Sequence, residues 1–177
     1  VEVSKPALES NVRVIKNLLN PSAKLMAVVK SNAYGHGLSE TASLFLKYRV
    51  DWLGVDNVDE AILLRENGLK APILVMGYTH PERFPEVVKY DLRVTIYNLP
   101  TTPKAPVTKL LTHLKIDTGM SRQGLLVSDL PAFLKLLPGN FNVEGVFTHF
   151  ANADNLNDRS FPNLQLIKFK QALQIIR

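Results

Sequence analysis

The sequence contains no cysteine among its 177 residues. This absence excludes disulfide bonds, thiolate nucleophiles and metal sites with cysteine ligands. The chain also has no apolar run long enough to span a bilayer, and its first six residues lack the basic and then apolar pattern of a secretory signal. We therefore expect a cytoplasmic protein with no membrane partner.

A clustered basic stripe is also absent, although the net charge is +5, from 21 basic and 16 acidic residues. Nucleic-acid-binding surfaces gather lysine and arginine on one face, whereas here these residues are scattered along the chain. We expect no nucleic-acid partner. The contents of 46% apolar and 21% charged residues are ordinary for a soluble globular protein, and the length suggests one domain.

Residues 25–29 form an apolar run without alternation, and Lys30 follows directly. Such a run is typical of a strand covered on both faces, as in a parallel sheet, and the ends of these strands are where chemistry is found. An amine held there in apolar surroundings loses solvation of its charged form and becomes nucleophilic toward a carbonyl. By itself, a lysine at a strand end is more often a solvated surface residue.

Helix and strand patterns alternate along the rest of the chain. A first helix is predicted to begin at Ser4, with Pro6 in its first turn, and to end before Pro21. Asn57 and Glu60 fit a capping arrangement for a later helix, which Gly68 closes. The other predicted elements are helices at 38–48, 57–67, 81–90, 130–137 and 163–176, and strands at 51–55, 72–77, 93–97, 113–117 and 143–149.

This alternation predicts βαβ units and a parallel α/β sheet. Two architectures fit the pattern, an open doubly wound sheet and a (β/α)₈ TIM-type barrel. The dinucleotide-binding fingerprint of the open sheet is missing, because no third glycine follows Gly35 and Gly37 at the required spacing.

A barrel needs eight strands, and the sequence predicts six. Residues 98–112, where a crossover helix would be expected, contain three prolines at positions 100, 103 and 106 and cannot be a regular helix. We therefore expect residues 1–177 to be an incomplete barrel of about six βα units, with an atypical crossover or missing residues at 98–112.

Three segments resemble the alanine racemases, which are pyridoxal-phosphate enzymes of fold type III. Residues 27–37, AVVKSNAYGHG, resemble the cofactor-attachment signature of that family. Residues 112–124 and 145–154 resemble two further segments of the family, in the family's order. The chain is identified as a member of this family, represented by its N-terminal barrel portion. The resemblance favours the barrel over the open sheet.

The resemblance implies that Lys30 forms a Schiff base with pyridoxal 5'-phosphate and also serves as the base on one face of the substrate. Tyr34 resembles the tyrosine that contacts the cofactor phosphate. Arg122 matches an arginine that reaches the cofactor's ring oxygen and the substrate carboxylate, a task that suits a planar guanidinium. Without the family motif, Tyr34 would be read as a packing aromatic and Arg122 as a solvated side chain.

Two further residues align with family positions. Lys115 matches a lysine that the family often carries in carbamylated form; the alternative is a plain lysine paired with a carboxylate. His149 matches a histidine near the cofactor ring. The other histidines, His36, His80 and His113, show no metal-ligand spacing, so no metal is expected.

The leading interpretation is an alanine racemase that supplies D-alanine for peptidoglycan, with alanine as its substrate and a homodimer as its full-length form. The family's tyrosine base on the opposite face and its partner for the pyridine nitrogen are not found here, and a C-terminal β-domain is expected to be absent. We therefore expect residues 1–177 alone to be inactive. The alternatives are a racemase for serine and a non-catalytic pyridoxal-phosphate-binding homeostasis protein.

Overall fold

The computed structural model describes residues 2–99, 109–155 and 157–177. The chain divides into two compact units, Val1–Val94 and Thr95–Arg177, and each unit is described by itself. The prolines of the atypical crossover predicted at 98–112 lie outside the described residues.

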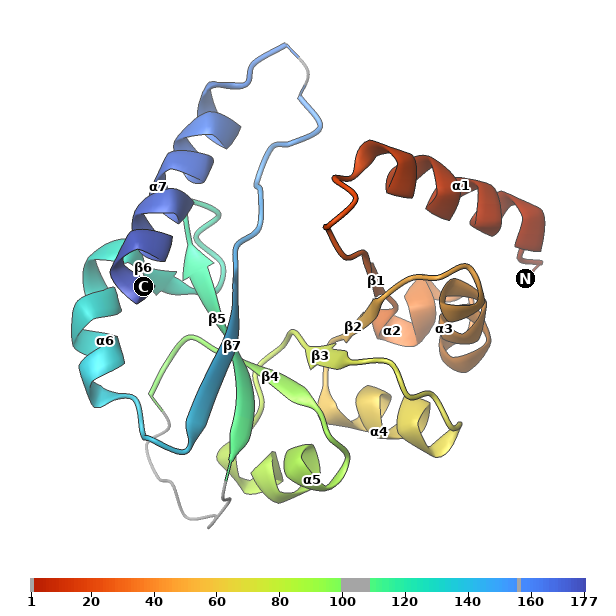
Figure 1. The fold of residues 1–177 in the computed structure, drawn as a ribbon, viewed down its shortest axis with the longest axis horizontal. Coiled ribbons are helices and arrows are strands. Elements are labelled where there is room, and N and C mark those ends of the chain that lie inside the picture. The colour runs from red at the N-terminus through yellow and green to blue at the C-terminus, as the bar shows by residue number, and fades with distance from the viewer. Residues whose placement is uncertain (1, 100–108, 156) are drawn as a thin grey trace. The chain divides into compact units, whose positions relative to one another are not determined.

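Parallel strands in sequence order form the sheet of the first unit (Figure 1). The register pairs Ala27 with Leu53 and Leu53 with Ile73, and Val75 pairs with Val94. The strands are β1 (Met26–Val28), β2 (Trp52–Val55), β3 (Ile73–Val75) and the start of β4 (Arg93–Ile96), whose last two residues are counted in the second unit. The helices of this unit are α1 (Lys5–Leu18), α2 (Lys30–Tyr34), α3 (Leu38–Lys47), α4 (Val58–Glu66) and α5 (Phe84–Lys89), with the short 3₁₀ helix η1 (Pro81–Arg83) before α5.

The helix starts follow the sequence signals. The Ser4 hydroxyl accepts a hydrogen bond from the backbone N–H of Ala7 and caps α1, with proline in the first turn. The side chain of Asn57 caps α4 in the same way, accepting from the N–H of Glu60 at 2.9 Å. Among the residues of α1 only Val12 is buried, and Ile15 is 46% exposed.

The core of the first unit lies on the face of the strands that is covered by helices. Leu53, Val55, Ile73 and Val75 are completely buried there. Figure 1 shows α3 and α4 on one side of these strands, and α4 contributes the completely buried Ala61 and Leu64, among others. The strands are apolar without alternation, as the sequence indicated, and β3 is buried along its whole length. The other face carries Gly54, where an added Cβ would lie 2.9 Å from the sulfur of Met76.

A half-buried arginine on α4 ties together two turns at the amino-terminal edge of these strands. Arg65 Nε and Nη2 donate to the carbonyls of Tyr90 and Asp91 at 2.9 and 3.1 Å. Its Nη1 donates to the carbonyls of Leu69 and Ala71, both at 2.8 Å. Burial lowers the pKa of the Arg65 guanidinium. The planar fork of arginine therefore satisfies four backbone acceptors with one side chain.

Replacing Arg65 by lysine should destabilise the protein although the charge is kept. A single ammonium cannot reach carbonyls on two separate turns, so some acceptors lose their partner, and we expect a cost of about 2 kcal/mol. The free energy of unfolding in urea measures the effect. Arg13→Lys on the exposed side of α1 is the matched control, and an equal effect of both substitutions would contradict this role of Arg65.

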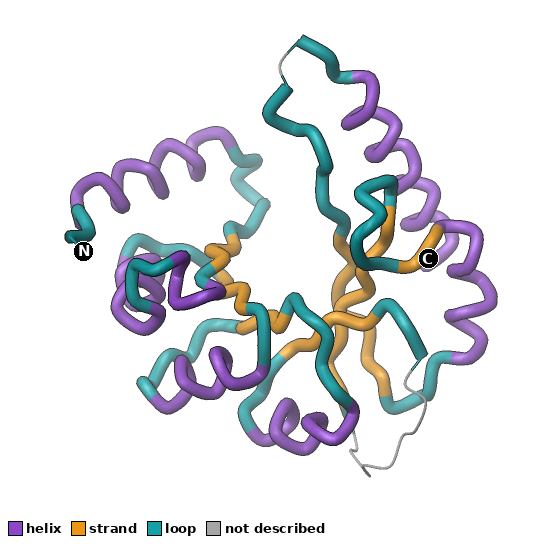
Figure 2. Tube along the Cα trace, turned by 180° about the vertical axis from the view of Figure 1, so that it is seen from behind, coloured by secondary structure: helices purple, strands orange, loops and turns teal. Residues whose placement is uncertain are grey.

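The second unit is built on a long strand, β5 (Leu110–Asp117). It pairs in parallel with β7 (Phe141–Phe147) and with the two-residue β6 (Leu125–Leu126). Figures 1 and 2 show α6 (Leu130–Leu136) and α7 (Ser160–Ile176) beside these strands, and a 3₁₀ turn, η2 (Val127–Asp129), precedes α6. Leu110, Leu114 and Ala172 are completely buried in this unit.

Most predicted elements are present, and two were missed. The structure has seven strands among the described residues, where six were predicted, because β6 is too short to show a periodic pattern. The short element α2, which begins at Lys30 and has a left-handed backbone, was not predicted either. Element ends differ by a few residues: β5 begins at Leu110 rather than at His113, and α7 begins at Ser160 rather than at Asn163.

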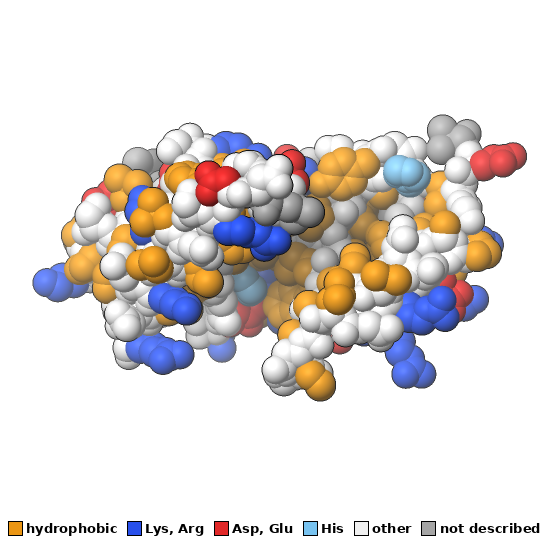
Figure 3. All heavy atoms as spheres, turned by 90° about the horizontal axis from the view of Figure 1, so that it is seen from above, with side chains coloured by type: hydrophobic (Ala, Val, Ile, Leu, Met, Phe, Trp, Pro, Cys, Tyr) orange, Lys and Arg blue, Asp and Glu red, His pale blue; other side chains and the backbone are white. Residues whose placement is uncertain are grey.

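Charged and apolar side chains are interspersed on the surface. In Figure 3 lysine and arginine side chains are spread over the visible face and do not form one stripe. Among the described residues, no helix combines the length and the apolar character needed to cross a membrane.

Candidate active site

Lys30 lies two residues after the end of β1, and Asp56 directly follows β2. The two residues lie at the carboxyl ends of adjacent parallel strands, which brings their side chains together. Lys30 Nζ donates a hydrogen bond to Asp56 Oδ1 at 3.2 Å. The side chains are 36% and 50% exposed. The expectation of apolar surroundings for this amine is therefore wrong: a carboxylate lies beside it, and solvent reaches it.

The turn after Lys30 is left-handed. Ser31, Asn32, Ala33 and Tyr34 have φ values of 54, 54, 52 and 54°. For residues with a side chain this conformation costs on the order of 1–2 kcal/mol each. None of the four is glycine, so a left-handed backbone could not be predicted here.

Hydrogen bonds to neighbouring elements hold this strained turn. Asn32 Oδ1 accepts from the N–H of Leu38 at 2.8 Å, and the N–H of Ala33 donates to the carbonyl of Val29 at 2.8 Å. The carboxylate of Glu60 accepts from the N–H of Ser31 at 2.6 Å. Ala33 is buried, and its methyl group anchors the turn in the core. Strain of this kind persists only where the surroundings determine the conformation, and it is found often at functional sites.

Tyr34 lies at the end of the turn and is 63% exposed. It lines a cavity of about 470 Å³, and Val28, Ala33 and residues of α1 and α3 also line this cavity. Lys30 is not among the lining residues. The structure thus places Lys30 and Tyr34 on one short turn, with the phenol and the amine both accessible.

Gly77 supports Asp56 from the next strand. Its N–H donates to the carbonyl of Asp56 at 3.0 Å, and an added Cβ would lie 2.4 Å from that oxygen. Only glycine permits this approach. Asp56, Glu60 and Gly77 are site residues that the sequence interpretation missed, because their roles depend on the pairing of strands far apart along the chain.

Lys115, on β5 of the second unit, is only 5% exposed. Its Nζ lies 5.4 Å from the centre of the Phe147 ring on the adjacent β7. A lysine is rarely buried to this degree, and an aromatic face is one of the few favourable neighbours for its charge.

Arg122 lies on the loop between β5 and β6 and is exposed. The carboxylate of Asp117 accepts from the N–H groups of Gly119 and Ser121 at 2.8 and 3.1 Å and so folds the start of the loop. At the other end Gly124 has φ of 144°, and an added Cβ would lie 2.5 Å from the backbone nitrogen of Asp117. The loop is therefore anchored at both ends, with Arg122 between the anchors.

His149 follows β7 by two residues, and a buried polar chain holds its backbone. Gln165 of α7 is completely buried, and its Nε2 donates to the carbonyl of His149 at 3.1 Å and to Thr118 Oγ1 at 3.2 Å. Thr148 Oγ1 donates to the carbonyl of Ile116 at 2.9 Å. The 2.8 Å contact between the two threonine hydroxyls must then be donated by Thr118, since the proton of Thr148 is already used.

Gln165 also accepts a hydrogen bond from the N–H of Ala151 through its Oε1, at 3.0 Å. The amide group thus bonds on both sides of the segment that carries His149. The arrangement fixes this segment to the end of β5, from which the Arg122 loop departs. Gln165 was not predicted, because a single glutamine in an amphipathic helix carries no functional signal.

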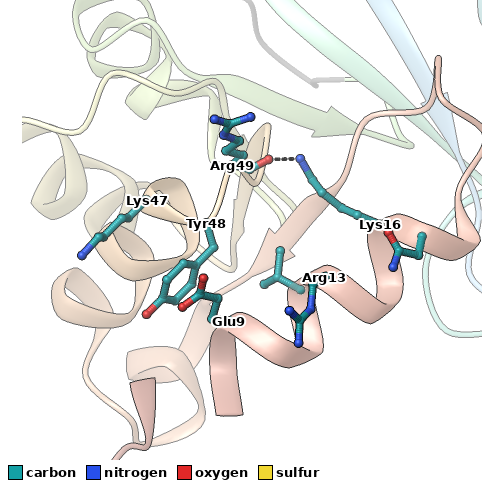
Figure 4. A pocket seen from close by; sticks show the side chains of 8 residues that line it. Glu9, Arg13, Lys16, Lys47, Tyr48 and Arg49 are labelled. Carbon is teal, nitrogen blue, oxygen red and sulfur yellow. Dashed lines mark hydrogen bonds between the residues drawn. The ribbon is translucent and has the colours of Figure 1, made fainter. Parts of the chain in front are cut away.

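A further cavity of about 320 Å³ lies between α1 and the end of α3 (Figure 4). Its lining includes Arg13, Lys16, Lys47 and Arg49, and the Lys16 amine donates to the carbonyl of Arg49. Figure 4 shows the Arg13, Lys16 and Lys47 side chains pointing in different directions. The charges have no common focus for an anionic ligand, so we assign no site here.

The comparisons with known proteins agree with one another. The family model for the N-terminal domain of alanine racemase matches residues 3–177. Alanine racemase 1 of Oceanobacillus iheyensis is 39% identical over 184 residues, which cover 99% of this chain and 49% of that protein. Alanine racemase 1 of Bacillus subtilis is 41% identical over 180 residues, which cover 97% of this chain and 46% of that protein. The chain therefore spans about half the length of the curated relatives it matches.

Solved structures give the same result. The crystal structure of alanine racemase from Bacillus anthracis with bound L-Ala-P matches with a TM-score of 0.89 and 31% identity, over 97% of this chain and 46% of that one. Alanine racemase of Clostridium difficile 630 in complex with cycloserine matches with a TM-score of 0.85 and 36% identity, over 94% of this chain and 48% of that one. The expected fold class, a parallel α/β sheet forming part of a (β/α)₈ barrel, is confirmed. Matched by the family model from residue 3 onward, the chain belongs to the alanine racemase family and represents its N-terminal domain.

Proposed function

We propose that the protein carrying this chain is a pyridoxal-phosphate-dependent alanine racemase, an isomerase that interconverts L- and D-alanine. The observation that carries the proposal is the accessible amine of Lys30 at the carboxyl end of β1, on a strained turn shared with Tyr34. Proteins similar to this chain over nearly its whole length are named alanine racemase. The structures of two relatives hold L-Ala-P or cycloserine.

The residues of the first unit fit pyridoxal phosphate. The cofactor carries an aldehyde, for which a primary amine is the matching group, and a phosphate, which hydroxyl and N–H donors bind. Lys30 offers the amine, and its hydrogen bond to Asp56 is a single, half-exposed contact that can be exchanged. Tyr34 offers an exposed hydroxyl on the same turn. When bound, pyridoxal phosphate supplies the electron sink that makes the α-proton of an amino acid acidic.

Lys30 then has two tasks in succession. Its Nζ would hold the cofactor covalently, and as a free amine it would take or return the α-proton on one face of the substrate. The carboxylate of Asp56, which accepts a hydrogen bond from Lys30 Nζ, would keep that amine at the strand end. Tyr34 holds the phosphate and fixes the position of the cofactor relative to Lys30.

The second unit carries three further residues of the proposed site, Arg122, Lys115 and His149. Arg122, on its anchored loop, pairs with the substrate carboxylate and with the cofactor's ring oxygen. Lys115 is the candidate for carbamylation, which would replace a cation that is buried against an aromatic ring by an anion able to orient the arginine. His149 borders the cofactor ring. Production of D-alanine for peptidoglycan, a cytoplasmic location and a homodimer belong to the same proposal.

The test uses the intact protein with added pyridoxal phosphate. We expect absorbance in the visible range, a borohydride-reduced adduct on the peptide that contains Lys30, and conversion of L-alanine to D-alanine measured by chiral chromatography. L-Serine in place of L-alanine tests the substrate. An adduct without turnover of either amino acid would support a non-catalytic pyridoxal-phosphate-binding protein and contradict the proposal.

A further inference from the structure

Glu60, in the first turn of α4, bonds to the backbone at the ends of two neighbouring strands. Its Oε1 accepts from the N–H of Ser31 at 2.6 Å, and its Oε2 accepts from the N–H of Asp56 at 2.8 Å. The last backbone bond between β1 and β2 joins the N–H of Val29 to the carbonyl of Gly54 at 2.8 Å. The carboxylate therefore extends the hydrogen bonding between the two strands beyond the point where their backbones separate.

The two backbone N–H groups that donate to Glu60 belong to residues that adjoin Lys30 or bond to it. Ser31 directly follows Lys30 and is the first residue of the left-handed turn that ends at Tyr34. Asp56 is the residue whose carboxylate accepts from Lys30 Nζ. The Glu60 side chain thus fixes the backbone of Ser31, where the strained turn starts, and the backbone of Asp56, the partner of Lys30.

This role of Glu60 is separate from helix capping. The N-terminus of α4 is capped by the side chain of Asn57, which accepts from the N–H of Glu60 and involves only the Glu60 backbone. A glutamate at this position of a capping box would bond back to the N–H of the cap residue. Here the carboxylate bonds instead to Asp56, one residue before the cap, and to Ser31 across the sheet.

We propose that Glu60 is a positioning residue for the cofactor: its carboxylate holds the left-handed turn in place and thereby sets Lys30 and Tyr34 in their relative positions. The inference rests on the proposed function, because it assigns Glu60 to the same site. A turn of four side-chain-bearing residues at positive φ is not stable by itself. Two charge-assisted hydrogen bonds from one rigid carboxylate supply the constraint that the local sequence lacks.

The experiment compares Glu60→Gln with Glu66→Gln in the intact protein. Both substitutions remove one negative charge from α4, but Glu66 is exposed at the end of the helix. In E60Q the amide NH₂ faces a backbone donor, so one of the two hydrogen bonds is lost. We expect the apparent dissociation constant for pyridoxal phosphate, from titration of the visible absorbance, to rise about tenfold in E60Q and to stay near the wild-type value in E66Q.

A second substitution separates positioning from general stabilisation. Glycine adopts positive φ without the cost that Cβ imposes, so Ser31→Gly eases the first residue of the turn. The double variant S31G/E60Q should therefore recover most of the lost affinity, in a cycle completed by S31G alone. A role of Glu60 only in the stability of α4 would give no such recovery. Faster hydrogen exchange in the peptide covering residues 29–35 of cofactor-free E60Q is a readout that does not depend on activity.

The outcomes separate the two proposals. If the wild-type protein forms no adduct that depends on Lys30, the proposed function fails, and this inference fails with it. If the adduct forms normally and E60Q binds the cofactor as E66Q does, only the role of Glu60 is overturned. Should E60Q not stay folded, Glu60→Asp takes its place, because it keeps the charge but is one methylene too short to reach both amides.

Discussion

Replacing Lys30 by alanine should abolish the visible absorbance of the protein with pyridoxal phosphate and the adduct trapped by borohydride. We expect racemisation of alanine to fall by at least roughly 10³-fold, because the substitution removes both the covalent attachment and one of the bases. The adduct is measured by mass spectrometry of the peptide that contains position 30. An adduct that persists in K30A would show that another amine holds the cofactor.

Lys24→Ala is the matched control for this experiment. Lys24 is an exposed lysine shortly before β1 and is not one of the proposed site residues. K30A also leaves Asp56 without its partner, but both side chains are at least one third exposed, so the stability should change by less than about 1 kcal/mol. Similar melting temperatures of K30A and K24A would therefore confirm that the lost activity is chemical and not a result of unfolding.

Replacing Gln165 by alanine should cause the largest loss of stability among the substitutions considered. The side chain is completely buried, and its removal leaves Thr118 Oγ1, the carbonyl of His149 and the N–H of Ala151 without this partner. Thr118 is buried, and a buried group without a partner costs about 1–3 kcal/mol, whereas the groups of His149 and Ala151 belong to exposed residues. The cavity left by the buried side chain adds to this cost, so we expect a total of about 4 kcal/mol. The midpoint and slope of urea unfolding measure it.

Gln171→Ala provides the comparison for Gln165→Ala. Gln171 lies on the same helix, α7, and is exposed, so its removal should change the stability by less than about 0.5 kcal/mol. If the two variants unfold at the same urea concentration, the polar chain from Gln165 to Ile116 does not stabilise the second unit. Because Gln165 holds the segment that carries His149, we also expect Q165A to impair cofactor binding more than its stability alone explains.

Much of the fold could be predicted because burial leaves a direct trace in the sequence. The apolar residues 25–29 and 72–77 predicted strands, and the structure has β1 and β3 there; all of β3 is buried, and β1 is buried at Ala27. Ser4 and Asn57 predicted helix starts because their side chains supply the missing acceptors. The two-residue β6 left no such trace. Its position depends on the loop that contains Arg122, which returns the chain to pair with β5.

The candidate site was predictable only in part. Lys30 and Tyr34 were found through the family motif, and they share a turn in the structure. Asp56 and Glu60 could not be found, because they meet Lys30 and Ser31 through contacts that span more than 25 residues. Such contacts follow from the register of parallel strands, which no local pattern in the sequence specifies. The two units carry different site residues, and the roles of Arg122, Lys115 and His149 remain part of the proposal.

The left-handed turn also bears on how this sequence would be redesigned. A design based on backbone angles alone would place glycine at positions 31 to 34. The sequence has serine, asparagine, alanine and tyrosine there. A redesign for maximal thermostability would therefore remove the phenol and the amide along with the strain. The segment illustrates a trade-off between stability and activity, in which folding free energy is given up to keep side chains at one edge of the sheet.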